Sequence, residues 1–134
     1  MTENTFPAAT SVLVVEDDFL VRSCAVEFLS DCGFTVLEAA DAPDAMAILE
    51  GAQVDVVFTD VNMPGAFDGL DLARRISHRW PHMAVVITSG RGCPDVEGTC
   101  ARFLPKPYML DTLTRLITEE AGHHAKPDSG RLAG

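Results

Sequence analysis

The chain is short of basic residues. It holds 10 Lys and Arg against 20 Asp and Glu over 134 residues, which gives a formal net charge of −10. Because the phosphate backbone of nucleic acid and the headgroups of anionic lipid would both repel such a chain, its composition argues against either as a partner. The same charge suits a divalent cation or a basic protein surface.

The sequence also lacks a long apolar run. A membrane-spanning helix needs about 20 consecutive apolar residues, and no stretch of this chain approaches that length. The first ten residues, MTENTFPAAT, contain an acid, no basic residue and no apolar block, so they do not resemble a secretory signal. We therefore expect a cytoplasmic protein without a membrane partner. Its length and its 47% hydrophobic content predict one globular domain with a true core.

Paired metal-binding motifs are absent as well. None of the four cysteines forms a CxxC pair, and no histidine lies at zinc-finger spacing from them. In a cytosolic chain this pattern predicts free thiols. His78 and His82 stand four residues apart, as a helical metal pair would, but Pro81 ends the helix between them. We therefore discount a histidine metal site.

The chain does contain an alternation of short apolar runs and amphipathic stretches. Strands are predicted over residues 11–15, 34–39, 54–60, 83–88 and 101–105, and helices over 19–33, 42–51, 69–80 and 108–120. Asp17 or Asp18, Asp41 and Asp68 stand where each can cap a helix. This order predicts an α/β fold, an open parallel sheet with helices on both faces. We expect the domain to span residues 11–120, between flexible segments at 1–10 and 121–134.

Polar side chains gather at the carboxyl ends of the predicted strands, where sheets of this kind bind ligands. They are Glu16, Asp17, Asp60, Thr88, Ser89 and Lys106. Neighbouring carboxylates repel one another unless a cation lies among them. Mg²⁺ prefers oxygen ligands, and Mn²⁺ is an alternative. Carboxylates, a divalent cation, a hydroxyl and an ammonium together suit phosphoryl transfer to an aspartate nucleophile.

Four segments, VLVVEDD, FTDVNMPG, VVITSG and FLPKPY, resemble the receiver domain of bacterial two-component response regulators, the CheY-like superfamily. The resemblance covers residues 11–120. It implies a flavodoxin-like, doubly wound, five-stranded parallel sheet in the order 2-1-3-4-5. It also implies a role in a phosphorelay, with a sensor histidine kinase or a histidine phosphotransfer protein as the phosphoryl donor.

The resemblance assigns roles to individual residues. Asp60 matches the phosphoacceptor, and the Mg²⁺ ligands are Glu16, Asp17, Asp60 and the backbone carbonyl of Asn62. Thr88 and Lys106 match the residues that contact the phosphoryl group, and Thr88 with Phe103 matches the conformational switch. The Lys106–Pro107 bond is expected to be cis, which aims the lysine into the site.

Several of these residues have a plainer interpretation. Asp18 suits a helix cap better than a place behind the metal ligands, and Ser89 could simply end its strand. Phe103 is as well explained by core packing as by switching. Thr88 as a mere strand end is disfavoured by the residues around it.

The chain departs from the family between the fourth and fifth strands. Residues 89–101 contain Gly90, Gly92, Gly98 and Pro94, and glycine costs about 1 kcal/mol in a helix interior against alanine. We predict that the helix expected here is reduced or replaced by a loop. Because partners of this family use that surface, we expect a monomer or weak dimer. Pro105 suits the fifth strand only at a sheet edge.

The favoured function is a stand-alone receiver that signals to an unidentified protein and catalyses only its own phosphorylation and dephosphorylation. No DNA-binding output domain is expected after residue 120. One rival is a phosphohydrolase of the haloacid-dehalogenase kind, but Asn62 stands where that family needs a second aspartate. Another is a pseudo-receiver, a binding module that takes no phosphoryl group. Retention of the full acidic and basic set argues against it.

Overall fold

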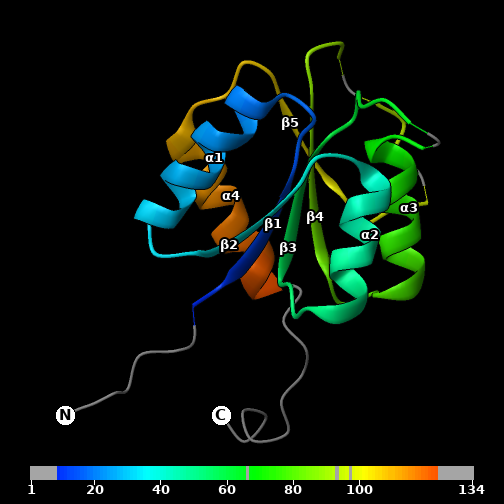
Figure 1. Ribbon diagram of the computed structural model, residues 1–134, viewed down its shortest axis with the longest axis horizontal. Helices are drawn as coiled ribbons and strands as arrows, with labels where there is room; N and C mark the ends of the chain where they lie inside the picture. Colours follow the sequence, from blue (N-terminus) through cyan, green and yellow to red (C-terminus); the bar gives the residue numbers. More distant parts are fainter. Residues whose placement is uncertain (1–8, 66, 93, 97, 124–134) are drawn as a thin grey trace, which may run out of the picture.

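The computed structural model describes residues 9–65, 67–92, 94–96 and 98–123 (Figure 1). The elements, in chain order, are β1 (Ser11–Val15), α1 (Phe19–Asp31), β2 (Thr35–Ala39), α2 (Ala42–Gly51), β3 (Val56–Asp60), α3 (Gly69–Arg79), β4 (Ala84–Ser89), β5 (Arg102–Pro105) and α4 (Leu110–His123). The strands pair in parallel in the order β2-β1-β3-β4-β5. The predicted flavodoxin-like sheet is therefore confirmed. The segments 1–8 and 124–134, which were expected to be flexible, lie outside the described residues.

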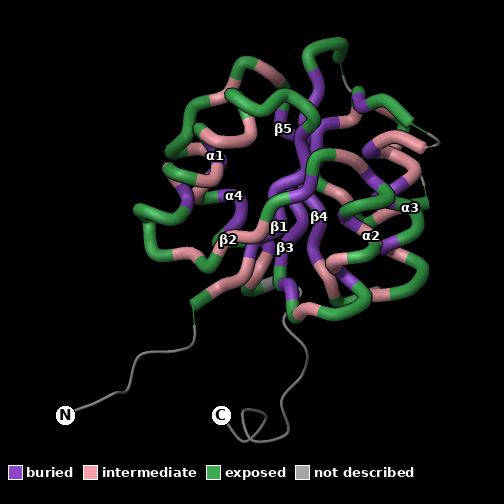
Figure 2. The backbone as a smooth tube through the Cα atoms, in the orientation of Figure 1, coloured by how far each residue is buried: buried purple, intermediate pink, exposed green. Residues whose placement is uncertain are grey.

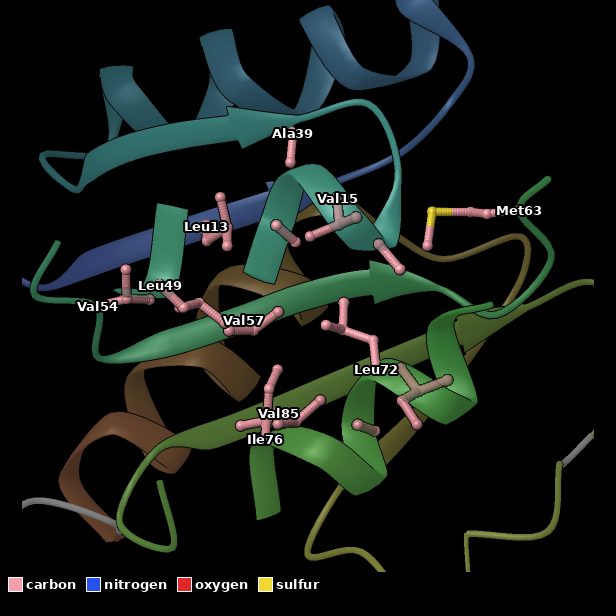
Figure 3. Close-up of a cluster of buried hydrophobic side chains, with 14 residues drawn as sticks. Leu13, Val15, Ala39, Leu49, Val54, Val57, Met63, Leu72, Ile76 and Val85 are labelled. Carbon is pink, nitrogen blue, oxygen red and sulfur yellow. The ribbon is translucent and has the colours of Figure 1, made fainter. Parts of the chain in front are cut away.

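The helices cover the sheet in two pairs, α1 with α4 on one face and α2 with α3 on the other (Figure 1). Side chains alternate between the faces along each strand, as strand geometry requires. Leu13, Val57 and Val85 point into the cluster under α2 and α3 (Figure 3). Val12 and Val56 point into the second cluster, under α1 and α4. The sheet thus separates two hydrophobic cores.

Every residue of β3 and β4 is buried, as the continuous purple of the central strands shows (Figure 2). A strand buried on both faces reads as an unbroken apolar run, which is why the valine-rich centres predicted these two strands well. β5 lies at the sheet edge, where Pro105 removes no hydrogen bond from a central ladder. Both predictions are confirmed.

Aspartate caps fix the starts of the first three helices. Asp18, rather than Asp17, caps α1 by accepting hydrogen bonds from the backbone N–H groups of Leu20 and Val21. Asp41 caps α2. Asp68 begins α3 with a reciprocal capping box, because the carboxylate of Asp71 in turn accepts from the Asp68 N–H.

The C-terminal helix α4 differs from its predicted limits. It begins at Leu110, two residues late, because its first backbone bond runs from Leu113 N–H to Met109 O. It continues three residues past Glu120, to His123. The extension follows from tertiary contacts, since Arg102 Nη1 lies 2.7 Å from a buried Glu120 carboxylate oxygen and Ala121 packs against the second core.

The apolar residues of α1, which recur at helical spacing, are only partly buried. Ala25 and Leu29 are buried as that pattern suggests, but Leu20 is 75% exposed and Val21 41% exposed. The apolar residues of the first turn of α1 thus stay outside the core that Ala25 and Leu29 enter. None of the helices in the described part of the chain is long and apolar enough to cross a membrane.

No helix forms between β4 and β5 in the described residues of segment 90–101, so the predicted loss of that helix is confirmed. Gly92 and Gly98 have φ values of 91° and 84°, left-handed conformations that glycine adopts at little cost. Two such residues within seven positions are incompatible with a continuous right-handed helix.

The segment that replaces this helix lies against α3. The Cys100 N–H donates to Ser77 Oγ at 3.2 Å, and Arg74 donates to the Asp95 carbonyl at 3.4 Å. Val96 and Ala101 pack against the core beneath α2 and α3. The loop is therefore anchored to the α3 side of the sheet.

Candidate functional site

The predicted site residues follow three neighbouring strands. β3 ends in Asp60, which is 6% exposed, and the parallel register places Asp60 opposite Thr88 on β4. Glu16 follows β1 directly and is 7% exposed. These three residues come together because carboxyl ends of parallel strands share one edge. Buried polar groups at that edge need partners, since each unpaired one costs free energy.

Asp60 is held by one contact on each carboxylate oxygen. Lys106 Nζ lies 2.7 Å from Oδ2, and the Asn62 N–H donates to Oδ1 at 3.0 Å. Burial works to lower the pKa of Lys106, but the hydrogen bond and charge of Asp60, helped by Glu16 and Asp17, outweigh it and raise that pKa. The lysine therefore stays charged at neutral pH. The Lys106–Pro107 peptide bond that follows is cis.

Glu16 carries an unusual pKa. Burial is the largest cause and, with the charge of Asp60, it raises the pKa of Glu16 to about 7. The hydrogen bond from the Asp18 N–H to Glu16 Oε2, at 3.1 Å, and the charge of Lys106 oppose that rise. The site therefore crowds carboxylates beyond what its one lysine neutralises.

Thr88 presents a hydroxyl with nothing to bond. Its side chain is 2% exposed, and Oγ1 is the one buried side-chain polar atom without a hydrogen-bond partner among the described residues. Leaving such a group unpaired costs about 1–3 kcal/mol. An oxygen atom arriving next to Asp60 would supply the missing partner.

The start of α3 lies unusually close to the phosphoacceptor candidate. Gly69 donates its N–H to the Val61 carbonyl at 3.0 Å, and a Cβ added at Gly69 would lie 1.9 Å from the Asp60 carbonyl oxygen. Sequence reasoning missed this glycine as a site residue. Its signal was a glycine at the first position of a helix, where a cap alone would not require one.

The remaining predicted residues take different places. Asp17 is exposed beside Glu16, while Asp18 serves as the α1 cap. Ser89 Oγ accepts the Arg91 N–H at 3.1 Å, which shapes the turn after β4. Phe103 is half-buried on β5, opposite Ile87, and belongs to neither buried cluster. Its half-buried position does not decide between core packing and switching.

The site's chemistry fits a hard divalent cation. Among the described residues no three His, Cys, Asp or Glu side chains form a ready metal cluster. Mg²⁺ does not require one, because it keeps several waters and binds through one or two carboxylates. The crowded carboxyls of Glu16 and Asp60, with the raised pKa of Glu16, are oxygen donors that a cation would relieve. Asp17 is free to turn toward it.

Comparisons with known sequences agree with this geometry. The sequence model of the response regulator receiver domain matches residues 12–118. The sensor kinase CckA of Brucella abortus (strain 2308) is 36% identical, over 83% of this chain and 12% of its own length. The transcriptional regulatory protein DctD of Rhizobium meliloti (strain 1021) is 32% identical, over 81% of this chain and 24% of its own length. The chain thus spans a quarter or less of these two relatives.

Solved structures give the same result. A receiver domain from Clostridium thermocellum superposes with a TM-score of 0.76 at 30% identity, covering 85% of this chain and 95% of its own. The receiver domain of the hybrid histidine kinase CckA superposes at 0.69 with 34% identity, covering 83% and 98%. A CheY-like protein from Methanospirillum hungatei JF-1 shares the fold, with a TM-score of 0.79 at 21% identity, covering 87% and 97%. The family match, the sheet order and the acidic strand ends lead to one conclusion: this chain belongs to the response regulator receiver domain family of two-component systems.

Proposed function

We propose that this domain accepts a phosphoryl group on Asp60 from a phosphohistidine of a sensor histidine kinase or a histidine phosphotransfer protein. The observation that carries the proposal is the contact between Lys106 Nζ and Asp60 Oδ2, in a site where Thr88 Oγ1 remains unpaired. The contacts on both oxygens of Asp60 fix the plane of its carboxylate. A nucleophile fixed in this way loses little orientational entropy when it reacts.

Three residues of the chain take part directly in the transfer of the phosphoryl group. A carboxylate oxygen of Asp60 forms a bond to phosphorus while the phosphorus–nitrogen bond breaks, and the histidine nitrogen keeps the electron pair. The Lys106 ammonium binds a transferred oxygen, and the Thr88 hydroxyl donates to another. A bound Mg²⁺, held by Asp17, Asp60 and the Asn62 carbonyl with Glu16 behind them, would neutralise the oxygens' charge.

Exposed apolar residues beside the site suit docking of the donor. Phe19, Leu20 and Val21 on α1 are exposed, as are Met109 and Leu110 where α4 begins, and Leu20, Val21 and Leu110 line one groove. The groove has a volume of about 310 Å³ and is also lined by Tyr108 and Ala25. A cluster of this kind on a soluble domain marks a protein contact surface. The family resemblance implies the same use for the first helix, near residues 19–25, as the surface on which the kinase docks.

Phosphorylation would then be read through conformational change. Thr88 turns toward the new phosphoryl oxygens, and Phe103, outside both cores, is free to reorient. The loop at 90–101 follows β4 and contacts α3 through Cys100 and Arg74, so a change at the end of β4 can shift its population. A downstream protein reads that change. The domain turns over no external metabolite.

Intact mass spectrometry tests the proposal. Incubation with acetyl phosphate and Mg²⁺ should add one phosphoryl group to the wild-type protein, and none with EDTA or in Asp60→Asn. Asp31→Asn, at the exposed end of α1, is the matched carboxylate control and should be labelled normally. Absence of labelling in the wild type would overturn the proposal and favour the pseudo-receiver.

A further inference from the structure

Arg22 connects the first helix to the acidic turn that follows β1. Its Nη1 donates to the backbone carbonyl of Glu16 at 2.7 Å, and its Nε donates to Glu38 Oε1 at 2.9 Å. The Arg22 side chain is only 14% exposed, although it carries a full charge on a surface helix. Its guanidinium carbon lies 5.5 Å from the ring centre of Phe19. The arginine is therefore fixed on three sides.

The Glu16 peptide is held from both directions. Its N–H donates to the carbonyl of Ala39, at the end of β2, at 3.1 Å. Its carbonyl is the atom that Arg22 binds. Because a peptide unit is planar, fixing the Glu16 carbonyl also fixes the N–H and the Cα of Asp17. The direction in which Asp17 leaves the turn is thus set by a contact from α1.

We propose that Arg22 is a positioning residue that orients the Glu16–Asp17 peptide so that the acidic pair can bind a divalent cation beside Asp60. This inference rests on the proposed function, because it concerns the same cation. The Arg22 side chain touches neither the cation nor the phosphoryl group in this role. It acts through the carbonyl of Glu16 and is itself held by Glu38.

Electrostatics alone makes the opposite prediction. A guanidinium near the site repels a divalent cation, so its removal should strengthen binding of Mg²⁺. If Arg22 positions the turn, its removal should instead weaken Mg²⁺ binding, because the turn then samples orientations in which Asp17 points away from the cation. Loss of a residue that orients metal ligands typically lowers affinity 10–100-fold. The sign of the change therefore separates the two explanations.

The experiment measures Mg²⁺ binding by isothermal titration calorimetry on the full chain. Arg22→Met removes both hydrogen bonds and the charge, and its affinity should fall about tenfold. Arg22→Lys keeps the charge but cannot bridge both partners, so its affinity should be intermediate. Glu38→Gln is the matched control. It neutralises the partner of Arg22 while leaving the Glu16 carbonyl bond possible, and its affinity should stay near wild type.

A second readout needs no metal. Hydrogen exchange in EDTA should be faster at the Asp18 amide, which donates to Glu16 Oε2, in Arg22→Met than in the wild type, with exchange in β3 unchanged. Unchanged exchange at the turn, or Mg²⁺ affinity equal to or tighter than wild type in Arg22→Met, overturns the inference. If Arg22→Met does not fold, wild-type affinity in Arg22→Lys overturns it. A wild-type protein that binds no Mg²⁺ refutes instead the metal-dependent proposed function.

Discussion

Replacing Gly69 by alanine tests how closely α3 must approach the phosphoacceptor strand. Gly69 opens α3 immediately after its Asp68 cap, and its N–H donates to the Val61 carbonyl. The Val61 N–H in turn donates to the Thr88 carbonyl at 2.9 Å. The start of α3 is thus bonded to the turn that follows Asp60, and that turn is bonded to the end of β4. A shift of this helix start reaches the candidate site directly.

The added methyl group would have no room. Its Cβ would lie 1.9 Å from the Asp60 carbonyl oxygen, 2.8 Å from the Asp60 carbonyl carbon and 3.0 Å from Thr59 Oγ1. The first distance must grow by at least 1.1 Å (3.0 minus 1.9) to reach the shortest separation that real side chains show. Overpacking costs about 1–3 kcal/mol. Since backbone rather than a flexible side chain must move, we expect a loss of about 2–3 kcal/mol.

Thermal unfolding followed by circular dichroism checks this value. At about 4 °C per kcal/mol for a domain of this size, the Tm of Gly69→Ala should fall by about 8–12 °C. Labelling by acetyl phosphate should also slow, because a misplacement of about 1 Å in a reacting group can cost up to about 100-fold in rate.

Gly51→Ala is the matched control. Gly51 is the last residue of α2, and an added Cβ there meets nothing within 4 Å. That variant should be neutral or more stable by up to about 1 kcal/mol. A Tm for Gly69→Ala equal to that of Gly51→Ala would refute the close-packing argument.

Three further predictions concern the rest of the domain. In EDTA, the free energy of unfolding should fall as pH rises from 4.5 to about 7, because the folded state holds a proton on Glu16 that the unfolded state has released. We expect a loss of about 1–2 kcal/mol, a value reduced because solvent at the exposed residues after Glu16 screens part of the effect. Urea titration at each pH measures it, and Glu16→Gln should show no such slope. Asp68→Ala should lose about 1–2 kcal/mol in the same assay, since both halves of its capping box disappear, whereas a loss near zero would show that α3 is held by packing alone. Amide exchange in the described residues of 90–101 should be slowed at Arg91, Thr99, Cys100 and Ala101, whose N–H groups donate hydrogen bonds, and fast at Gly92 and Gly98; uniform strong protection would mean that a helix forms there.

Features with a short-range physical cause were predictable from the sequence. Valine-rich runs identified β3 and β4 because both strands are buried on both faces, which leaves no polar alternation to interpret. Asp41 and Asp68 identified helix starts because a cap bonds its own next turn. The glycines and the proline of residues 89–101 predicted the missing helix for the same local reason, and Gly92 and Gly98 have positive φ in the structure. The approach of Lys106 to Asp60 was anticipated through the family resemblance, since the two residues are 46 positions apart.

Features that depend on a distant contact were not predictable. The end of α4 lies beyond Glu120 because Arg102, on β5, pairs with that carboxylate, and nothing near Glu120 in the sequence signals it. The exposure of the apolar first turn of α1 is another case, because periodicity reports which face of a helix is apolar and not whether a sheet lies beneath it.

The roles of Gly69 and Arg22 also depend on contacts with residues elsewhere in the chain, and these contacts affect the functional site. Each acts on the backbone of the acidic strand ends, Gly69 by leaving room for the Asp60 carbonyl and Arg22 by binding the Glu16 carbonyl. Residue type identifies side chains that do chemistry, because carboxylate, hydroxyl and ammonium each have a characteristic reactivity. A residue that positions a backbone carbonyl needs only a long side chain, as in Arg22, or no side chain, as in Gly69. Many residues in a sequence meet one of these conditions. The residues that hold a site in place are therefore identified from the structure and not from the sequence. In this domain, substitution of Gly69 or Arg22 should alter the chemistry of the site without changing a reacting atom.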